Sequence, residues 1–168
     1  MSEGDAGCAM FQVLFQGDLF ADYHQFYIHD EAHPDLPDDY TDAAIARRLM
    51  AGPHAVIVHT ARNMDVPVCV EWHRARPEPD LDAYQHVVEA GLSCPTGSLM
   101  LAGLTHVGGS TRLAAPVGPL GLRASFSGLD TLSADGLEGD DRYLVQLWPG
   151  AGDADAAGVR VLKPWPPT

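Results

Sequence analysis

The stretch Val66-Pro67-Val68-Cys69-Val70-Glu71-Trp72-His73 gives the clearest indication of this protein's fold. Its apolar residues recur at every second position, which is the period of a β-strand with one buried face. Pro67 has no N–H group, so we expect this strand to begin at an edge or a bulge. Eight further stretches are strand-like and are bounded by Gly, Pro or Asp: 11–15, 20–28, 55–59, 84–92, 98–104, 121–126, 143–148 and 159–162. This pattern predicts an all-β fold, a two-sheet β-sandwich of about eight or nine short strands with one short α-helix.

The predicted helix covers residues 43–51. Thr41 can cap its first turn, and Gly52-Pro53 ends it. Ile45 and Leu49 are four residues apart, so they share a narrow apolar stripe. We expect this stripe to pack against one end of the sandwich.

The stretch 84–92 also allows a second interpretation. Asp80 and Asp82 resemble the start of a helix, so residues 84–89 are compatible with helix as well as with strand. We favour the strand.

The composition limits the classes of function. A chain of 168 residues, 46% hydrophobic and 20% charged, is typical of one globular domain. We therefore expect residues 1–168 to form a single β-sandwich domain, with residues 1–9 and 150–158 mobile because they are small and polar. Asp and Glu number 23 against 10 Lys and Arg, a net charge of −13. Phosphate backbones and anionic lipids repel such a chain, so we expect no direct nucleic-acid binding and no membrane binding.

The cysteines and the N-terminus indicate a cytoplasmic protein. Cys8, Cys69 and Cys94 cannot form a full set of intramolecular pairs, which favours reduced thiols. The first residues, Met1-Ser2-Glu3-Gly4-Asp5, are acidic where a secretory signal needs Lys or Arg. We therefore expect a cytoplasmic location.

The segment His29-Asp30-Glu31-Ala32-His33 invites enzymatic interpretations that its context does not support. A zinc protease needs Glu directly after the first His on a helix, and a zinc deaminase needs a downstream Pro-Cys-x-x-Cys pair. A helicase needs a phosphate loop, and the chain has none. We interpret the segment as a polar loop after a strand, with loose metal binding as the alternative. We predict a protein that is not an enzyme, with no catalytic residues, no metal ligands and no cofactor.

Calcium binding is the main alternative function. The run Asp135-Gly136-Leu137-Glu138-Gly139-Asp140-Asp141 concentrates four carboxylates in a glycine-rich loop between strands. Hard oxygen ligands of this kind suit Ca²⁺, although the spacing of an EF-hand is absent. A calcium- or small-ligand-binding β-sandwich module therefore stays open beside the leading hypothesis.

Charge placement is the strongest functional signal. Between residues 18 and 42 there are eight acidic residues and no Lys or Arg, a net charge of −8 in 25 residues, and aromatic residues are interleaved with them. A solvated surface explains the acids equally well. However, acidic loops with aromatic anchors also suit a basic protein partner, because complementary fields speed encounter and buried rings slow release. The predicted partner-binding residues are Tyr23, Phe26, Asp35, Asp38, Asp39 and Tyr40, extended by Glu138, Asp140 and Asp141.

Tyr23 and Phe26 cannot both be surface anchors if they lie on one regular strand. Successive side chains of a strand point to opposite faces, and these two residues are three apart. At least one of them is therefore expected in the core.

Several short motifs resemble the competence protein J family. They are Asp22-Tyr23-His24-Gln25-Phe26, Thr41-Asp42-Ala43-Ala44-Ile45, the region 84–104 and the strand 143–148, so the resemblance spans roughly residues 18–149. It implies a small intracellular inhibitor that binds and blocks a DNA-entry nuclease. The leading hypothesis is accordingly a non-enzymatic inhibitor or immunity-type protein whose acidic face blocks a basic, DNA-degrading nuclease. The extension after Pro149 departs from the family pattern.

Overall fold

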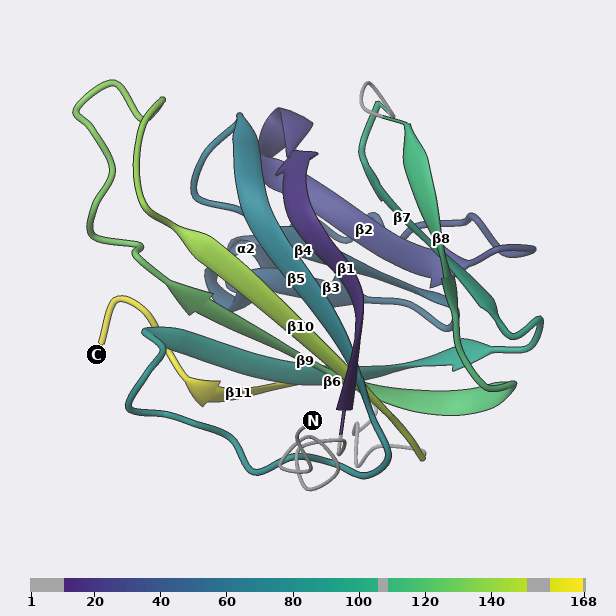
Figure 1. Ribbon diagram of the computed structural model, residues 1–168. Coiled ribbons are helices and arrows are strands. Elements are labelled where there is room, and N and C mark those ends of the chain that lie inside the picture. The colour runs from purple at the N-terminus through teal and green to yellow at the C-terminus, as the bar shows by residue number, and fades with distance from the viewer. Residues whose placement is uncertain (1–10, 106–108, 151–157, 168) are drawn as a thin grey trace, which may run out of the picture.

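The computed structural model describes residues 11–105, 109–150 and 158–167, which form two packed β-sheets (Figure 1). The elements in chain order are β1 (Phe11–Phe20), the 3-10 helix η1 (Asp22–His24), β2 (Gln25–Asp30), the α-helix α2 (Asp42–Arg47), β3 (Leu49–Ala51), β4 (Ala55–His59), β5 (Asp65–His73), β6 (His86–Cys94), β7 (Ser98–Gly103), β8 (Ser110–Ala114), β9 (Gly118–Ser127), β10 (Arg142–Pro149) and β11 (Val159–Lys163). The predicted all-β sandwich with one short α-helix is confirmed.

The two sheets differ in size and order. Sheet A has the order β1-β5-β10-β9-β6-β11, and sheet B has the order β3-β4-β2-β7-β8. Strands β5 and β10 pair in parallel from Val68 and Tyr143 onward, and the other pairs are antiparallel. At Pro67, β5 has β1 as its paired neighbour and its pairing with β10 has not yet begun. Pro67 therefore lies at a local edge, as its missing N–H predicts.

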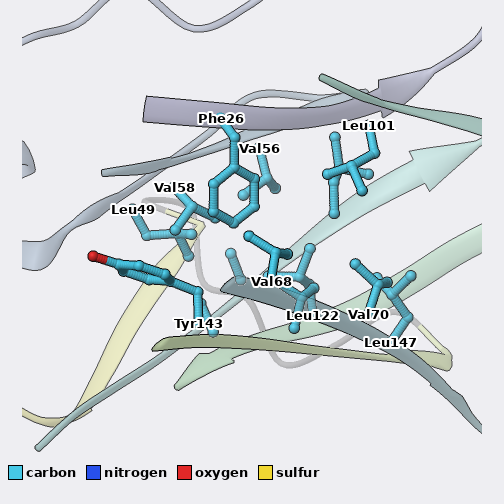
Figure 2. Close-up of a cluster of buried hydrophobic side chains, with 14 of the residues drawn as sticks. Phe26, Leu49, Val56, Val58, Val68, Val70, Leu101, Leu122, Tyr143 and Leu147 are labelled. Atoms are coloured by element: carbon cyan, nitrogen blue, oxygen red, sulfur yellow. The ribbon is translucent and has the colours of Figure 1, made fainter. Parts of the chain in front are cut away.

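The main core lies between the two sheets. Val66, Val68 and Val70 of β5 are buried and face inward, as the alternation predicts. In Figure 2, Val68 and Val70 lie across the interface from Phe26 and Leu101 of sheet B. The Phe26 and Tyr143 rings meet edge to face, with 6.3 Å between their centroids. Burial of this alternating apolar set is what holds the sheets together.

The predicted helix is shorter than expected. Thr41 caps it, since Oγ1 accepts a hydrogen bond of 3.1 Å from the Ala44 N–H, but α2 ends at Arg47. Arg48 then takes the left-handed conformation (φ 62°), and Leu49–Ala51 form strand β3 beside β4. The helical pattern was wrong for 48–51 because pairing with β4 buries Leu49 completely, and such tertiary burial outweighs helix propensity. The expected stripe is also wrong, because Ile45 is 49% exposed.

The predicted strand 20–28 is interrupted. Residues Asp22–His24 form η1, and Tyr23 and His24 have positive φ angles of 59° and 61°. Strand β2 therefore begins at Gln25, and the sequence prediction also missed β3 and the short edge strand β8. The part of the chain that the structure describes thus holds eleven strands, two more than the upper estimate.

Other sequence predictions are not tested. Residues 1–10 and 151–157 lie outside the described part of the chain, so the predicted mobility of 1–9 and of most of 150–158 stays a prediction.

The choice of strand over helix for the stretch 84–92 is confirmed, because β6 begins at His86 and continues to Cys94.

Within the described residues, none of the helices has both the length and the apolar character needed to cross a membrane.

Candidate functional site

The acidic segment 31–41 lies against the outer face of sheet B. Tyr27, Met50 and Ile57 point outward from that sheet and form a second apolar cluster with Ala44 of α2, and Leu36 packs against it. Packing of the partly buried Leu36 against this cluster holds the segment to the sheet, and burial of Ala44 does the same for α2. Asp38 and Asp39 remain exposed on it.

Tyr40 is held at one end of sheet B. Its hydroxyl donates to Gln25 Oε1 at 3.0 Å, and its ring meets the His59 ring edge to face, with 6.0 Å between centroids. The side chain is 47% exposed. Tyr40 thus presents a fixed aromatic surface, which loses little side-chain entropy when a partner covers it.

The loop between β9 and β10 meets the same end of the sandwich. Arg62, three residues after His59, donates from Nη1 to the Leu137 carbonyl at 3.4 Å and from Nε to Asp141 Oδ1 at 2.5 Å. Both Tyr40 and this loop therefore contact the short segment 59–62.

Hydrogen bonds within the loop hold its shape. The Asp140 N–H donates to Thr131 Oγ1 at 2.7 Å, and the Glu138 N–H donates to Ser133 Oγ at 3.0 Å. Glu138 and Asp140 are exposed. Their carboxylates are thus carried on a braced loop and not on a freely moving one.

We define the acidic face as Asp38, Asp39, Tyr40, Glu138 and Asp140. Within residues 11–105, 109–150 and 158–167, none of its four carboxylates forms an ion pair. Exposed, unpaired carboxylates on one end of the molecule produce a negative field that extends into solvent. Tyr40 and the loop that carries Glu138 and Asp140 thus contact the same segment 59–62, and Asp38 and Asp39 directly precede Tyr40 in the chain.

Two of the predicted binding residues are in the interior. Phe26 is fully buried in the main core, because β2 places it on the inward face of sheet B. Asp141 is also fully buried, and it accepts hydrogen bonds from Arg62 and from the Tyr143 hydroxyl. Neither side chain is available to a partner, so both assignments were wrong.

The other two predicted residues are also exposed: Asp35 lies toward the start of β4, and Tyr23 lies near the end at which Tyr40 is held, since Gln25 Nε2 donates to the Tyr23 carbonyl at 3.5 Å. Asp35 precedes Pro37, whose ring lies against Gly52 just before β4, whereas Tyr40 lies at the end of β4. Tyr23 is 65% exposed in η1, where its N–H donates to Asn63 Oδ1 at 2.8 Å. Partner binding by Asp35 and Tyr23 stays a prediction.

Not all acids between residues 18 and 42 contribute to the surface charge. Asp22 and Asp30 are buried, and Glu31 pairs with Arg112 at 2.6 Å. Burial alone would raise the pKa of Asp30, but hydrogen bonds from His33, Thr96 and Ala32 outweigh it and hold the pKa well below its usual range. Asp30 is therefore an anion that fixes the turn after β2, and the expected polar loop begins only after it.

The carboxylates of the proposed calcium loop do not converge. Asp141 points inward to Arg62, while Asp135 accepts hydrogen bonds from Ser133 Oγ at 2.6 Å and the Leu137 N–H at 3.1 Å. Among the described residues, no three His, Cys, Asp or Glu side chains are placed to hold a metal ion. The calcium alternative gains no support from this geometry.

Sequence reasoning missed a polar network on the outer face of sheet A. Arg123 is 1% exposed, and it donates to Glu89 Oε2 at 2.9 Å, to Gln146 Oε1 at 3.1 Å and to the Pro77 carbonyl at 2.6 Å. Arg76 and Arg160 also donate to Glu89. Burial raises the pKa of Glu89, but these three arginines outweigh it and the net pKa shift is downward. Single charged residues inside apolar strands were the signal that could have revealed the network.

Comparisons with known proteins identify two structures of similar architecture. No family model matches the chain, and no curated protein sequence does. One solved structure covers 84% of this chain and 99% of its own, with a TM-score of 0.64 and 18% identity. The fold is similar to that of ComJ.

ComJ, from Bacillus subtilis, is an inhibitor of the DNA-degrading activity of NucA. The structure of crocagin biosynthetic gene J is also similar, with a TM-score of 0.55 and 17% identity, covering 83% of this chain and 97% of that one. At such identities the likeness shows a shared fold. The fold expected from the short competence protein J motifs is thereby confirmed.

Proposed function

We propose that this chain is a protein inhibitor that binds a DNA-degrading nuclease through the acidic face and blocks its access to DNA. The observation that carries the proposal is a fold similar to that of ComJ over 84% of the chain, combined with four exposed, unpaired carboxylates at one end. A basic character of the target and a cytoplasmic site of action belong to the same proposal.

The physical basis is competition for a positive surface. A nuclease attracts DNA through Lys and Arg residues that neutralise phosphates. The acidic face offers the same sign of charge as DNA, and the chain's net charge of −13 adds a long-range attraction. Tyr40 supplies a fixed, partly exposed ring that can be covered in the complex. This arrangement needs no bond-making step, so the proposed activity is not enzymatic.

A nuclease assay tests the proposal directly. The nucleases encoded in the same genome as this chain are purified, and each is assayed for degradation of double-stranded DNA with increasing amounts of the chain. We expect at least one nuclease to lose activity with a fixed stoichiometry, and the loss to be relieved by Asp38→Lys with Asp39→Lys. If every nuclease keeps full activity in the presence of an excess of the chain, the proposal is wrong.

A further inference from the structure

A second surface lies on the outer face of sheet A. It contains a pocket of about 370 Å³ beside the edge strand β1. The strand register places Gln16 beside Cys69 and Asp18 beside Pro67, with Leu144 on the other side of Cys69. These residues alternate with the inward-facing Val66, Val68 and Val70, so they face away from the core.

The pocket combines apolar and acidic lining residues. Pro67 and Leu144 line it together with Tyr84, Asp18 and Glu71. Glu71 also accepts a hydrogen bond from Gln146 Nε2 at 3.2 Å and lies 2.8 Å from His73 Nε2. Asp18 and Glu71 against the single lining cation, Arg142, give a net charge of 1 − 2 = −1. An aromatic ring beside two carboxylates favours a cation, through both charge and the face of the ring.

The electrostatics of Tyr84 agree with this sign. Burial raises the pKa of its phenol, and the negative charges of Glu71 and Asp80 raise it further. Glu71 also adds to the effect of burial in raising the pKa of the Cys69 thiol. Burial is the larger cause of both shifts, and the smaller part that comes from Glu71 has the sign expected beside a carboxylate, which favours a positive charge.

The backbone edge of β1 is the second feature of this surface. Strand β1 is the first strand of sheet A, and no strand of the described residues pairs with its outer edge (Figure 1). Strand β1 also approaches β7 and β8 of sheet B, and at its end Phe20 lies against Gly103 of β7. Its exposed residues are 11–13 and 16–18. Phe11 and Val13 there are 43% and 46% exposed. Strand β1 contains no Lys, Arg or Pro, the residues with which exposed edges are commonly protected, although it carries a bulge at Leu14.

We infer that β1 and the adjacent pocket bind an extended, basic segment of a protein partner. The partner backbone would pair with the edge of β1, and an Arg or Lys side chain would enter the pocket between Asp18 and Glu71, beside the Tyr84 ring. Main-chain pairing supplies affinity in this mode of recognition, and the pocket supplies the preference for a basic residue.

Charge argues against a second copy as the occupant. Each copy carries a net charge of −13, so two copies repel each other. Pairing of β1 with another β1 would also bring a second Asp18, and no cation, to the pocket. A basic segment removes both objections. The inference does not depend on whether the target of the acidic face is a nuclease.

Defined peptides test the inference on the full chain. The probe is the capped hexapeptide Thr-Arg-Val-Arg-Val-Thr, and the controls replace its Arg residues by Glu or its Val residues by Pro. Binding is followed through the backbone amide NMR signals of residues 11–18 and 84. We expect the basic peptide to shift these signals and both control peptides to leave them unchanged, because one lacks the charge and the other cannot pair as a strand.

Two variants that change the net charge by the same amount test whether the basic peptide binds beside Asp18. Asp18→Arg should weaken binding of the basic peptide about tenfold or more, because it places a cation at the pocket. Asp35 is also an exposed acid, on segment 31–41, and Asp35→Arg should leave binding unchanged. Asp18→Asn provides a milder second variant with an intermediate loss. Equal weakening by Asp18→Arg and Asp35→Arg would mean that only overall charge matters, and the inference would be wrong.

Cys69 provides an independent readout. Its partly exposed thiol lines the pocket, whereas Cys94 is buried. In a Cys8→Ser background, the basic peptide should slow alkylation of Cys69 by iodoacetamide, and the Glu-containing peptide should not. Unchanged alkylation at a saturating concentration of the basic peptide, or shifts confined to residues 35–40, would overturn the inference.

Discussion

Arg62 and Asp141 form a buried ion pair that joins the two sheets, with Nε 2.5 Å from Oδ1. Arg62 follows β4 of sheet B, and Asp141 immediately precedes β10 of sheet A. The second oxygen of Asp141 accepts from the Tyr143 hydroxyl, which in turn accepts from the Ala61 N–H at 2.7 Å. Asp141 directly follows Asp140, so the pair lies beside the loop that carries Glu138 and Asp140.

Removing one member of this pair should destabilise the fold strongly. Asp141→Ala leaves the Arg62 guanidinium buried without its carboxylate, which costs about 3–5 kcal/mol. Urea denaturation measures the free energy of unfolding. The exposed neighbour Asp140→Ala is the matched control and should change it by less than about 0.5 kcal/mol. Similar small effects of both variants would contradict a structural role for Asp141.

The stability should fall as the pH drops from about 6.5 to about 4. Burial and then the charge of Arg48 lower the pKa of His59 from 6.5 to about 4. Above pH 6.5 the His59 side chain is neutral in both the folded and the unfolded protein. Below pH 6.5 the unfolded chain binds the proton first, so folding is progressively disfavoured. The loss is complete once the pH is below the folded pKa and amounts to roughly 3 kcal/mol.

His59→Gln should flatten this part of the pH profile of the unfolding free energy. The exposed His24→Gln is its control and should retain the wild-type slope. His86, whose pKa burial also lowers, contributes in the same direction, so some slope remains in His59→Gln. A slope equal to wild type in His59→Gln would show that this histidine does not carry the effect.

The network on sheet A should behave as a buried charge cluster. Glu89→Ala leaves the fully buried Arg123 unpaired, and we expect a loss of about 3–5 kcal/mol in unfolding free energy. The double variant Glu89→Leu with Arg123→Met removes both charges, so it should be more stable than Glu89→Ala alone. Arg160→Ala is the surface control, because the side chain of Arg160 is 49% exposed, and should cost less than about 1 kcal/mol. A double variant less stable than Glu89→Ala would contradict this account.

Charge on the acidic face should govern the rate of complex formation with the inhibited nuclease. Asp38→Lys with Asp39→Lys changes the net charge from −13 to −13 + 4 = −9, and we expect the association rate constant to fall about tenfold or more at low salt. The dependence of that rate on salt should become shallower. Stopped-flow mixing measures both quantities.

A matched pair of reversals elsewhere separates local from overall charge. Glu78→Lys with Asp82→Lys produces the same net charge at two exposed positions between β5 and β6, outside the acidic face. We expect a much smaller decrease in association rate. The same decrease in both double variants would assign steering to net charge alone.

The candidate site was only partly predictable, because sequence position does not specify burial. Asp38 and Asp39 were predicted as exposed acids, and they are exposed. Asp30 has the same chemistry and lies in the same run of acids, yet it is fully buried because His33 and Thr96 reach its carboxylate. Thr96 is 66 residues away along the chain, so no local pattern could have indicated this contact.

The period-two alternation of residues such as Val66, Val68 and Val70 was enough to determine the β-sandwich, since apolar faces repeated along short strands can be buried only by stacking two sheets. The pairing of Arg62 with Asp141, the change from helix to strand at Leu49, and the meeting of Tyr40 with the β9–β10 loop were decided by tertiary structure. Each depends on a contact between distant segments, and the energy of such a contact exceeds the local preferences that a sequence displays.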